Sequence, residues 1–172
     1  MTEPPVDSHP DSTLDDNPLP DGNSEAGVEL LLFALGDEWY GLPVEQVAGV
    51  EPWRAVARLP GTSPSVLGLA LWHGEVIPVL DPTPLLTGTS SSAEDGYLVI
   101  GRAPAGPVGL AVRAVAAVAT ADRRAIDAPL SAVDPSRARL VYGHVQVEGR
   151  WVALLALASL VDAAVGHDHE RA

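Results

Sequence analysis

The sequence predicts an all-β protein built from two small, pseudo-symmetric five-stranded barrels with short helices. Three observations lead to this prediction. Short Val/Leu-rich runs bounded by Gly, Pro or Asp follow one another along most of the chain. X-Gly pairs, which suit tight hairpins, separate some of these runs. The second half of the chain also repeats the pattern of the first half.

Ten runs have the length of a β-strand, which is about five for each half of the chain. Five short strands curl readily into a small barrel, because closure removes the exposed edges of the sheet. The ten predicted strands span residues 30–35, 38–42, 47–50, 66–71, 76–80, 97–100, 108–112, 115–119, 140–147 and 151–155.

Tight turns are predicted at three places, Gly36-Asp37, His73-Gly74 and Glu148-Gly149. Glycine accepts a positive φ, so each pair fits a two-residue hairpin turn. Helix signals are few. We expect short helices over residues 82–86, where proline can occupy the first helical position, and over the Ala/Leu-rich residues 156–165.

The internal repeat is the most informative feature of the chain. Residues 41–50 match residues 109–118 at an offset of 68, with identity at six of ten positions. We therefore expect residues 28–88 and 96–165 each to form one barrel, with exchange of a strand or of the final helix between the halves as an option. Four further identities share an offset of 75: Gly68 with Gly143, Gly74 with Gly149, Leu80 with Leu155, and Leu85 with Leu160.

The two ends of the chain differ from its middle. Residues 1–27 hold seven acids and no Arg, for a net charge of −7, whereas residues 28–165 hold fourteen acids and nine Arg, for −5. A Pro-rich acidic segment buries too little apolar surface to offset its ordering entropy. We therefore expect a disordered tail over 1–27, a folded domain over 28–165 and a flexible C-terminus over 166–172.

Several function classes lack their sequence signals. No Arg stripe is visible for nucleic-acid binding, and no apolar run approaches the ~20 residues that span a bilayer. No signal peptide is recognisable, so we expect a cytoplasmic protein without direct membrane insertion. The chain has no Cys, no Lys and no H-E-x-x-H motif, and Gly61-Thr62-Ser63-Pro64-Ser65 fails the G-x-S-x-G pattern at its last position. We expect no catalytic residue, no cofactor and no metal.

Four blocks in order resemble the CheW-like domain family. Residues 32–42 are similar to its opening hairpin, and residues 68–81 resemble its central G-x-x-N-L-R-G-x-x-x-P-V-x-D signature. Residues 108–115 resemble its V-G-L-x-V-D-x-V segment, and residues 142–160 resemble its closing hairpin and helix. The resemblance spans residues 29 to about 164 and implies two SH3-like barrels.

This resemblance implies a non-enzymatic chemosensory adaptor. Such a scaffold couples chemoreceptors to a CheA-type histidine kinase in chemotaxis signal transduction. Its implied partners are the regulatory domain of the kinase and the cytoplasmic tip of the receptor, and we expect a monomer when free, recruited to membrane-associated receptor arrays. Two alternatives stay open: a divergent member of a specialised array with altered receptor binding, and a sensor that binds a small molecule or peptide in a groove between the barrels.

The chain departs from the family pattern at four positions. In the central signature the family's Asn, Leu and Arg are Leu71, Trp72 and His73 here, and the family's acid in the second half is Arg113. The Asn and Arg belong to the polar features that the family uses around its partner contacts. These departures therefore bear on receptor recognition rather than on the fold.

Candidate partner-binding residues follow from the resemblance. It places the stretch after the 43–46 turn and the strand over 68–73 beside a groove that receives the receptor tip, which would be helix-in-groove recognition. Trp72 is either an interface anchor or packed on its own barrel, and His73 should be exposed at its turn. The predicted partner-binding residues are Val47, Gly49, Gly68, Leu71, Trp72, His73 and Arg113.

Overall fold

The computed structural model describes residues 27–89, 95–129 and 135–170. Its strands confirm the predicted all-β class, with ten strands in two five-stranded sheets. The predicted acidic tail lies outside the described residues except for Gly27. The strands are β1 (Gly27–Leu35), β2 (Glu38–Pro43), β3 (Val47–Pro52), β4 (Val66–Trp72), β5 (Glu75–Leu80), β6 (Tyr97–Ala103), β7 (Gly106–Val112), β8 (Ala114–Asp122), β9 (Val141–Val147) and β10 (Arg150–Leu155).

Short helices connect and cover the strands. The helices are α1 (Thr83–Thr87), α2 (Pro135–Ala138) and α3 (Leu157–Glu170), with 3-10 turns η2 (Val44–Gln46) and η4 (Arg123–Ala125). Helix α3 runs to Glu170 and so includes most of the residues 166–172, for which a flexible C-terminus was predicted. No proline follows Gly166, and a helical glycine costs only about 1 kcal/mol relative to alanine, so the helix continues.

The predicted hairpin turns are confirmed. His73 and Gly74 between β4 and β5 have φ of 47° and 81°, and Glu148 and Gly149 between β9 and β10 have φ of 51° and 78°. Two successive residues with positive φ form the type I′ turn that matches the twist of a two-residue hairpin. The same local chemistry therefore closes the equivalent hairpin in each half.

Each sheet combines strands from both halves of the chain. One sheet has the order β8-β1-β2-β10-β9, and the other has the order β3-β6-β7-β5-β4. Replacing every strand by its repeat equivalent turns one order into the other. The assignment of residues 28–88 to one barrel and 96–165 to the other is therefore wrong, because three strands of each half cross to the opposite sheet. The chain crosses at η2 and again between β7 and β8.

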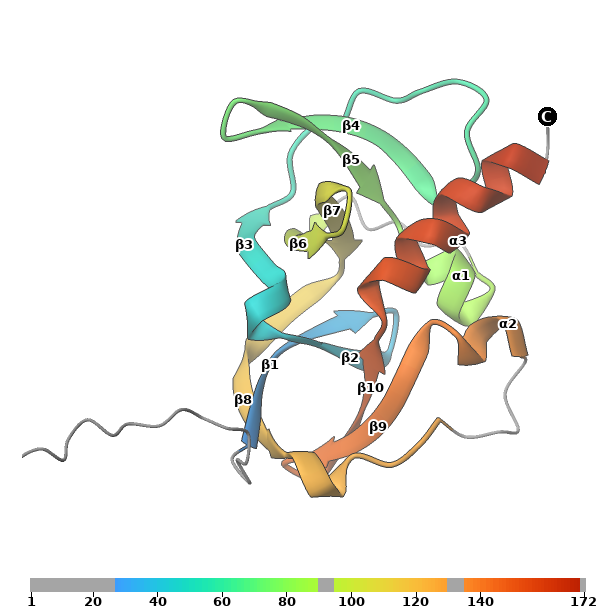
Figure 1. Ribbon diagram of the computed structural model, residues 1–172. Coiled ribbons are helices and arrows are strands. Elements are labelled where there is room, and N and C mark those ends of the chain that lie inside the picture. Colours follow the sequence, from blue (N-terminus) through green and yellow to red (C-terminus); the bar gives the residue numbers. More distant parts are fainter. Residues whose placement is uncertain (1–26, 90–94, 130–134, 171–172) are drawn as a thin grey trace, which may run out of the picture.

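Both sheets close into barrels by equivalent bridges. We call the first sheet barrel A, which an antiparallel bridge between Asp127 and His144 closes. The second sheet is barrel B, and a bridge between Ala57 and Leu69 closes it at the corresponding place. Figure 1 shows the two barrels one above the other, with α3 along one side.

Three buried clusters hold this arrangement. Barrel A has an interior cluster around Leu32 and Leu154, and barrel B has one around Ile77 and Ile100. The largest cluster lies between the barrels and is closed by α3; it includes Phe33, Leu42, Leu80, Leu110, Leu155 and Leu160. We call it the central cluster. It fills space between the barrels where the small-molecule alternative expected a groove.

Candidate partner-binding surface

The β4–β5 hairpin presents an apolar pair to solvent. Leu71 lies opposite Val76 in the antiparallel pairing, and their side chains are 60% and 65% exposed. The neighbouring pair, Ala70 and Ile77, is buried in barrel B. Alternation along both strands therefore puts one pair in the core and the next on the surface. Adjacent exposed apolar side chains of this kind are typical of a docking surface.

Trp72 packs on its own barrel, which was one of the two predicted readings. Its half-buried ring contacts the interior cluster of barrel B, and a Cβ added at Gly49 would lie 3.8 Å from that ring. The indole therefore spans from β4 to β3 across the gap between these two terminal strands. His73 is exposed at the turn as predicted, and its ring lies 4.4 Å from that of Trp72.

The edge of β4 is covered by the segment that follows β3. The Arg54 guanidinium donates to the Leu71 carbonyl at 2.8 Å and also pairs with the Glu51 carboxylate. Ala57 exchanges backbone hydrogen bonds with Leu69 at 2.8 and 2.9 Å. Since these groups occupy the edge, a partner on this hairpin would meet its side chains rather than extend the sheet.

Gly68 belongs to this barrel closure rather than to the surface. It is buried with φ of 147°, and an added Cβ would lie within 3.0 Å of the Ala57 carbonyl oxygen. A glycine is needed here because the segment around Ala57 passes directly over the strand. Gly68 therefore allows the Ala57 segment to approach the hairpin closely, and it is not part of the exposed surface.

The remaining predicted residues lie at the two crossings between the barrels. Val47 follows η2, pairs with Gly101 and packs half-buried against the central cluster. Arg113 is exposed between β7 and β8, and its Nε donates to the Gly36 carbonyl at 2.6 Å. The structure therefore brings Gly49, Trp72 and His73 together on barrel B and places Arg113 beside the β1–β2 turn.

Several exposed apolar residues that were not predicted as partner-binding occupy equivalent positions in the two repeats. Val76 and its equivalent Trp151 are both exposed, as are Val50 and its equivalent Val118. The offsets of 75 and 68 relate the two pairs. The repeat could have identified Val76, because period-2 alternation from the turn places it opposite the predicted Leu71.

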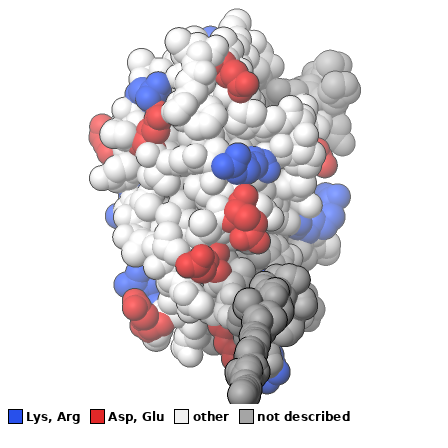
Figure 2. All heavy atoms as spheres, turned by 60° about the vertical axis from the view of Figure 1, so that its left-hand side comes forward, with Lys and Arg blue, Asp and Glu red and all other residues white. Residues whose placement is uncertain are grey.

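Charges on this side of the molecule are scattered. Figure 2 shows Arg and acidic side chains of both signs spread over one face of the molecule, without a basic stripe. Among the described residues, no group of three or more His, Asp or Glu is arranged to hold a metal ion. No helix in the described part of the chain is both long and apolar enough to cross a membrane.

A comparison with protein families decides the relationship. The model of the CheW-like domain matches residues 29–165, which is nearly all of the described chain. The chain belongs to the CheW-like domain family. The predicted resemblance is thereby confirmed, including its extent along the sequence.

Individual CheW proteins agree with this family match. The chain is 25% identical over 138 residues to the chemotaxis protein CheW of Rhizobium meliloti (strain 1021), covering 80% of this chain and 89% of that protein. It is 32% identical over 57 residues to the chemotaxis protein CheW of Bacillus subtilis (strain 168), covering 33% and 36% of the two chains. These relatives support a chemotaxis adaptor role for this CheW-like chain.

A solved CheW structure has the same fold. The crystal structure of the scaffolding protein TtCheW from Thermoanaerobacter tengcongensis superposes with a TM-score of 0.71 at 24% identity, covering 78% of this chain and 92% of that one. The exchanged double barrel is therefore the fold of a CheW protein.

Proposed function

We propose that this CheW-like protein is a non-enzymatic chemosensory adaptor that couples chemoreceptors to a CheA-type histidine kinase. The match to the CheW-like domain over residues 29–165 carries the proposal. The adaptor works in the cytoplasm and joins receptor arrays at the membrane by binding, without chemistry of its own. Separate surfaces for the kinase and the receptor would let the adaptor hold both partners at once.

The β4–β5 hairpin is proposed as one border of the receptor-binding groove. Leu71 and Val76 supply exposed apolar area, and His73 supplies a polar contact at the turn. Trp72 and Gly49 act from behind this surface by fixing the hairpin on barrel B. The contact should have modest affinity, because two apolar side chains form a small patch compared with the ~800 Å² that each partner buries in a standard interface.

The other proposed border of this groove lies on β3, where the chain crosses between the barrels at Val47. A hollow of about 380 Å³ opens beside the preceding residue, Gln46, and is also lined by Arg102, Tyr142 and the start of α3. A helical receptor tip could place apolar side chains against Val47 and its polar face towards Arg102. The exposed guanidinium of Arg113 lies at the second crossing and would contact partner groups from the opposite side.

A co-purification experiment tests the adaptor role. The tagged protein, recovered from its native cell, should bring down a histidine kinase and a chemoreceptor, identified by mass spectrometry. The double variant Leu71→Ser/Val76→Ser should lose the receptor while keeping the kinase. Val165→Ser, which changes an exposed valine on α3, is the matched control and should keep both. Recovery of neither partner by the unmodified protein would refute the proposal.

The altered central signature supports a second candidate, a divergent adaptor with changed receptor binding. The Asn and Arg of the family are Leu71 and His73 here, and Trp72 packs against Gly49 behind them. The same experiment separates the candidates. An ordinary adaptor brings down both partners, whereas the divergent adaptor brings down the kinase without a conventional receptor.

A further inference from the structure

A second hollow lies on barrel A, away from the β4–β5 hairpin, and aromatic rings line it. Its volume is about 490 Å³, and its lining includes Trp39, Tyr40, His144, Trp151 and Ala153. The whole chain has only four Trp and three Tyr, so aromatic residues are concentrated here. The Trp151 side chain is 58% exposed, which leaves its ring open for contact. Open aromatic surfaces of this kind bind proline-rich segments.

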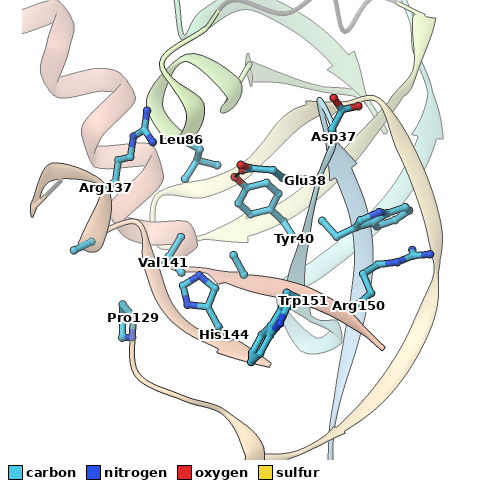
Figure 3. A pocket seen from close by; sticks show the side chains of 13 residues that line it. Asp37, Glu38, Tyr40, Leu86, Pro129, Arg137, Val141, His144, Arg150 and Trp151 are labelled. Atoms are coloured by element: carbon cyan, nitrogen blue, oxygen red, sulfur yellow. Dashed lines mark hydrogen bonds between the residues drawn. The ribbon is translucent and has the colours of Figure 1, made fainter. Parts of the chain in front are cut away.

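Arginines gather in the part of the chain that surrounds this hollow. Residues 123–150 hold five of the ten Arg of the chain and three acids. Arg137 and Arg150 line the hollow at opposite sides, as Figure 3 shows. The Arg150 guanidinium also lies 4.3 Å from the centre of the Trp39 ring. A ligand that packs on the rings therefore has cationic groups within reach.

The acids of the rim lie at one end of the hollow. Figure 3 shows Asp37 and Glu38 at the end away from Trp151. The Glu38 carboxylate already accepts a hydrogen bond from the Tyr40 hydroxyl at 2.6 Å. An acidic ligand is therefore favoured at the other end, where Trp151 and Arg150 are neighbours.

The chain itself contains a segment with the complementary chemistry. Residues 1–26, which we call the N-terminal segment, hold five Pro, seven acids and no Arg or Lys, for a net charge of −7. Near its end, Pro18-Leu19-Pro20 is flanked by Asp15-Asp16 on one side and by Asp21 on the other. Two proline rings and a leucine suit an aromatic surface, and the flanking acids suit arginines.

This segment joins the folded domain beside the same arginines. Gly27 begins β1 and pairs with Asp122, the last residue of β8. Asp122 is followed directly by Arg123 and Arg124 of η4, and both are exposed. The acids nearest the junction, Asp21 and Glu25 in the sequence, are therefore attached close to two cationic side chains.

The length of the N-terminal segment matches the distance to the hollow. Trp39 of β2 pairs with Ala34 of β1 and with Val152 of β10. Strand geometry therefore puts Val152 about 26 Å from Gly27, which is seven residues before Ala34 and two strands away. Nine residues of chain span at most about 30 Å, so Pro18 can reach the start of β10.

We propose that the N-terminal segment docks on barrel A of its own chain, with Pro18-Leu19-Pro20 against the Trp151 ring and its acids paired with Arg150 and the two arginines of η4. The covalent link favours this occupant, because it holds the segment near the hollow at a high effective concentration. The contact goes beyond the adaptor role. It leaves the β4–β5 hairpin uncovered, since that hairpin belongs to barrel B.

A spin label on the full-length protein tests the docking. The chain has no Cys, so Asn17→Cys gives one labelling position without changing the charge of the segment. A nitroxide at this position broadens the NMR signals of protons close to it. The indole N–H signals of Trp39 and Trp151 should lose more than half of their intensity, whereas those of Trp53 and Trp72 should keep theirs. Full intensity at all four indoles, or the same loss at all four, would overturn the proposal.

Two variants separate the charge from the ring. Arg150→Glu should restore most of the Trp151 signal, and Trp151→Ala should restore most of the Trp39 signal. Both positions are exposed, so the fold should be kept. Arg58→Glu, which reverses another exposed arginine far from Trp151 in the sequence, is the matched control and should leave the broadening as it was. Unchanged broadening in either test variant would contradict the proposed contacts.

A mixed sample distinguishes docking on the same chain from docking on a second copy. Isotope-labelled protein without the nitroxide is combined with unlabelled protein that carries it, and only the first is observed. The Trp151 signal should keep its full intensity in this mixture. Broadening there would show that the segment binds another copy, and the proposal would be wrong.

Discussion

Gly41 of β2 lies directly opposite Leu154 of β10 in the parallel pairing that joins the two halves of the chain within barrel A. The repeat equivalents, Gly109 of β7 and Val79 of β5, lie opposite each other in barrel B. The same glycine therefore marks the seam in both barrels, where a strand of one half meets a strand of the other.

The two seam glycines should respond differently to alanine. A Cβ at Gly41 would lie 3.2 Å from Val152 and 3.3 Å from Leu154, whereas one at Gly109 would lie 3.4 Å from its nearest neighbour, Val79. Gly41→Ala should therefore lower the free energy of unfolding by about 1–2 kcal/mol through overpacking. Gly109→Ala, the matched control, should change it by less than about 0.5 kcal/mol. Equal effects in urea denaturation would show that the seams are packed alike.

Neither half of the chain should fold alone. Every barrel takes strands from both halves of the chain. A fragment of residues 27–95 therefore lacks β8 and β10, which pair with β1 and β2, and it lacks β6, which pairs with β3. Such a fragment should show no cooperative unfolding by circular dichroism, and mixing it with residues 96–172 should restore the transition. Cooperative unfolding of the isolated first fragment would contradict the exchanged topology.

Gly68 should be the least replaceable glycine of barrel B. Gly68→Ala places a methyl group against the Ala57 carbonyl, so the closing segment has to move. Gly106→Ala is the matched control, because Gly106 also has a positive φ, of 133°, but has open space around it. Both variants carry backbone strain, and Gly68→Ala should cost about 1–3 kcal/mol more from the clash. Similar melting temperatures for the two variants would refute this role.

Alkaline pH should destabilise the protein through Tyr40. Burial, and then the hydrogen bond to Glu38, raise the pKa of Tyr40 above its ordinary value of 10.0. Below that pH the tyrosine is neutral in both states, so its contribution to stability is complete. As the pH rises further, the unfolded chain loses its proton first and the free energy of unfolding falls.

The chain has no Lys, so few other side chains titrate in this range. Denaturation curves between about pH 9 and 11.5 should show a decline that is shallower in the Tyr40→Phe variant. Trp151→Phe, which changes an exposed ring and removes no titratable group, should keep the original slope. An unchanged slope in the Tyr40→Phe variant would contradict the effect of burial.

Local features of this fold could be read from the sequence. Alternating Val/Leu runs and X-Gly turns predicted the strands and hairpins, and the repeat predicted two equivalent barrels. The exchange between halves could not be read in the same way, because a duplicated unit has the same sequence whether its strands pair within one half or across both. The pairing of Gly41 with Leu154 and of Gly109 with Val79 distinguishes these topologies, as do the pairings of β1 with β8 and of β3 with β6.

The candidate surface was predicted in part. A turn at His73 implies exposure, and the structure agrees. The role of Gly68 depends on Ala57, which is eleven residues away and approaches it only through barrel closure. The hollow beside His144 likewise depends on Tyr40 and Ala153, which are distant in sequence and adjacent only across the seam. Contacts of this kind carry no local sequence signal.

The adaptor role itself is tested most directly by sedimentation. Membranes that contain the chemoreceptor are mixed with the soluble histidine kinase, with and without this protein, and pelleted. The account predicts that the kinase enters the pellet only when the adaptor is present, and that the Leu71→Ser/Val76→Ser variant fails to bring it down. Kinase recovery in the pellet that is the same with and without the protein would contradict the account.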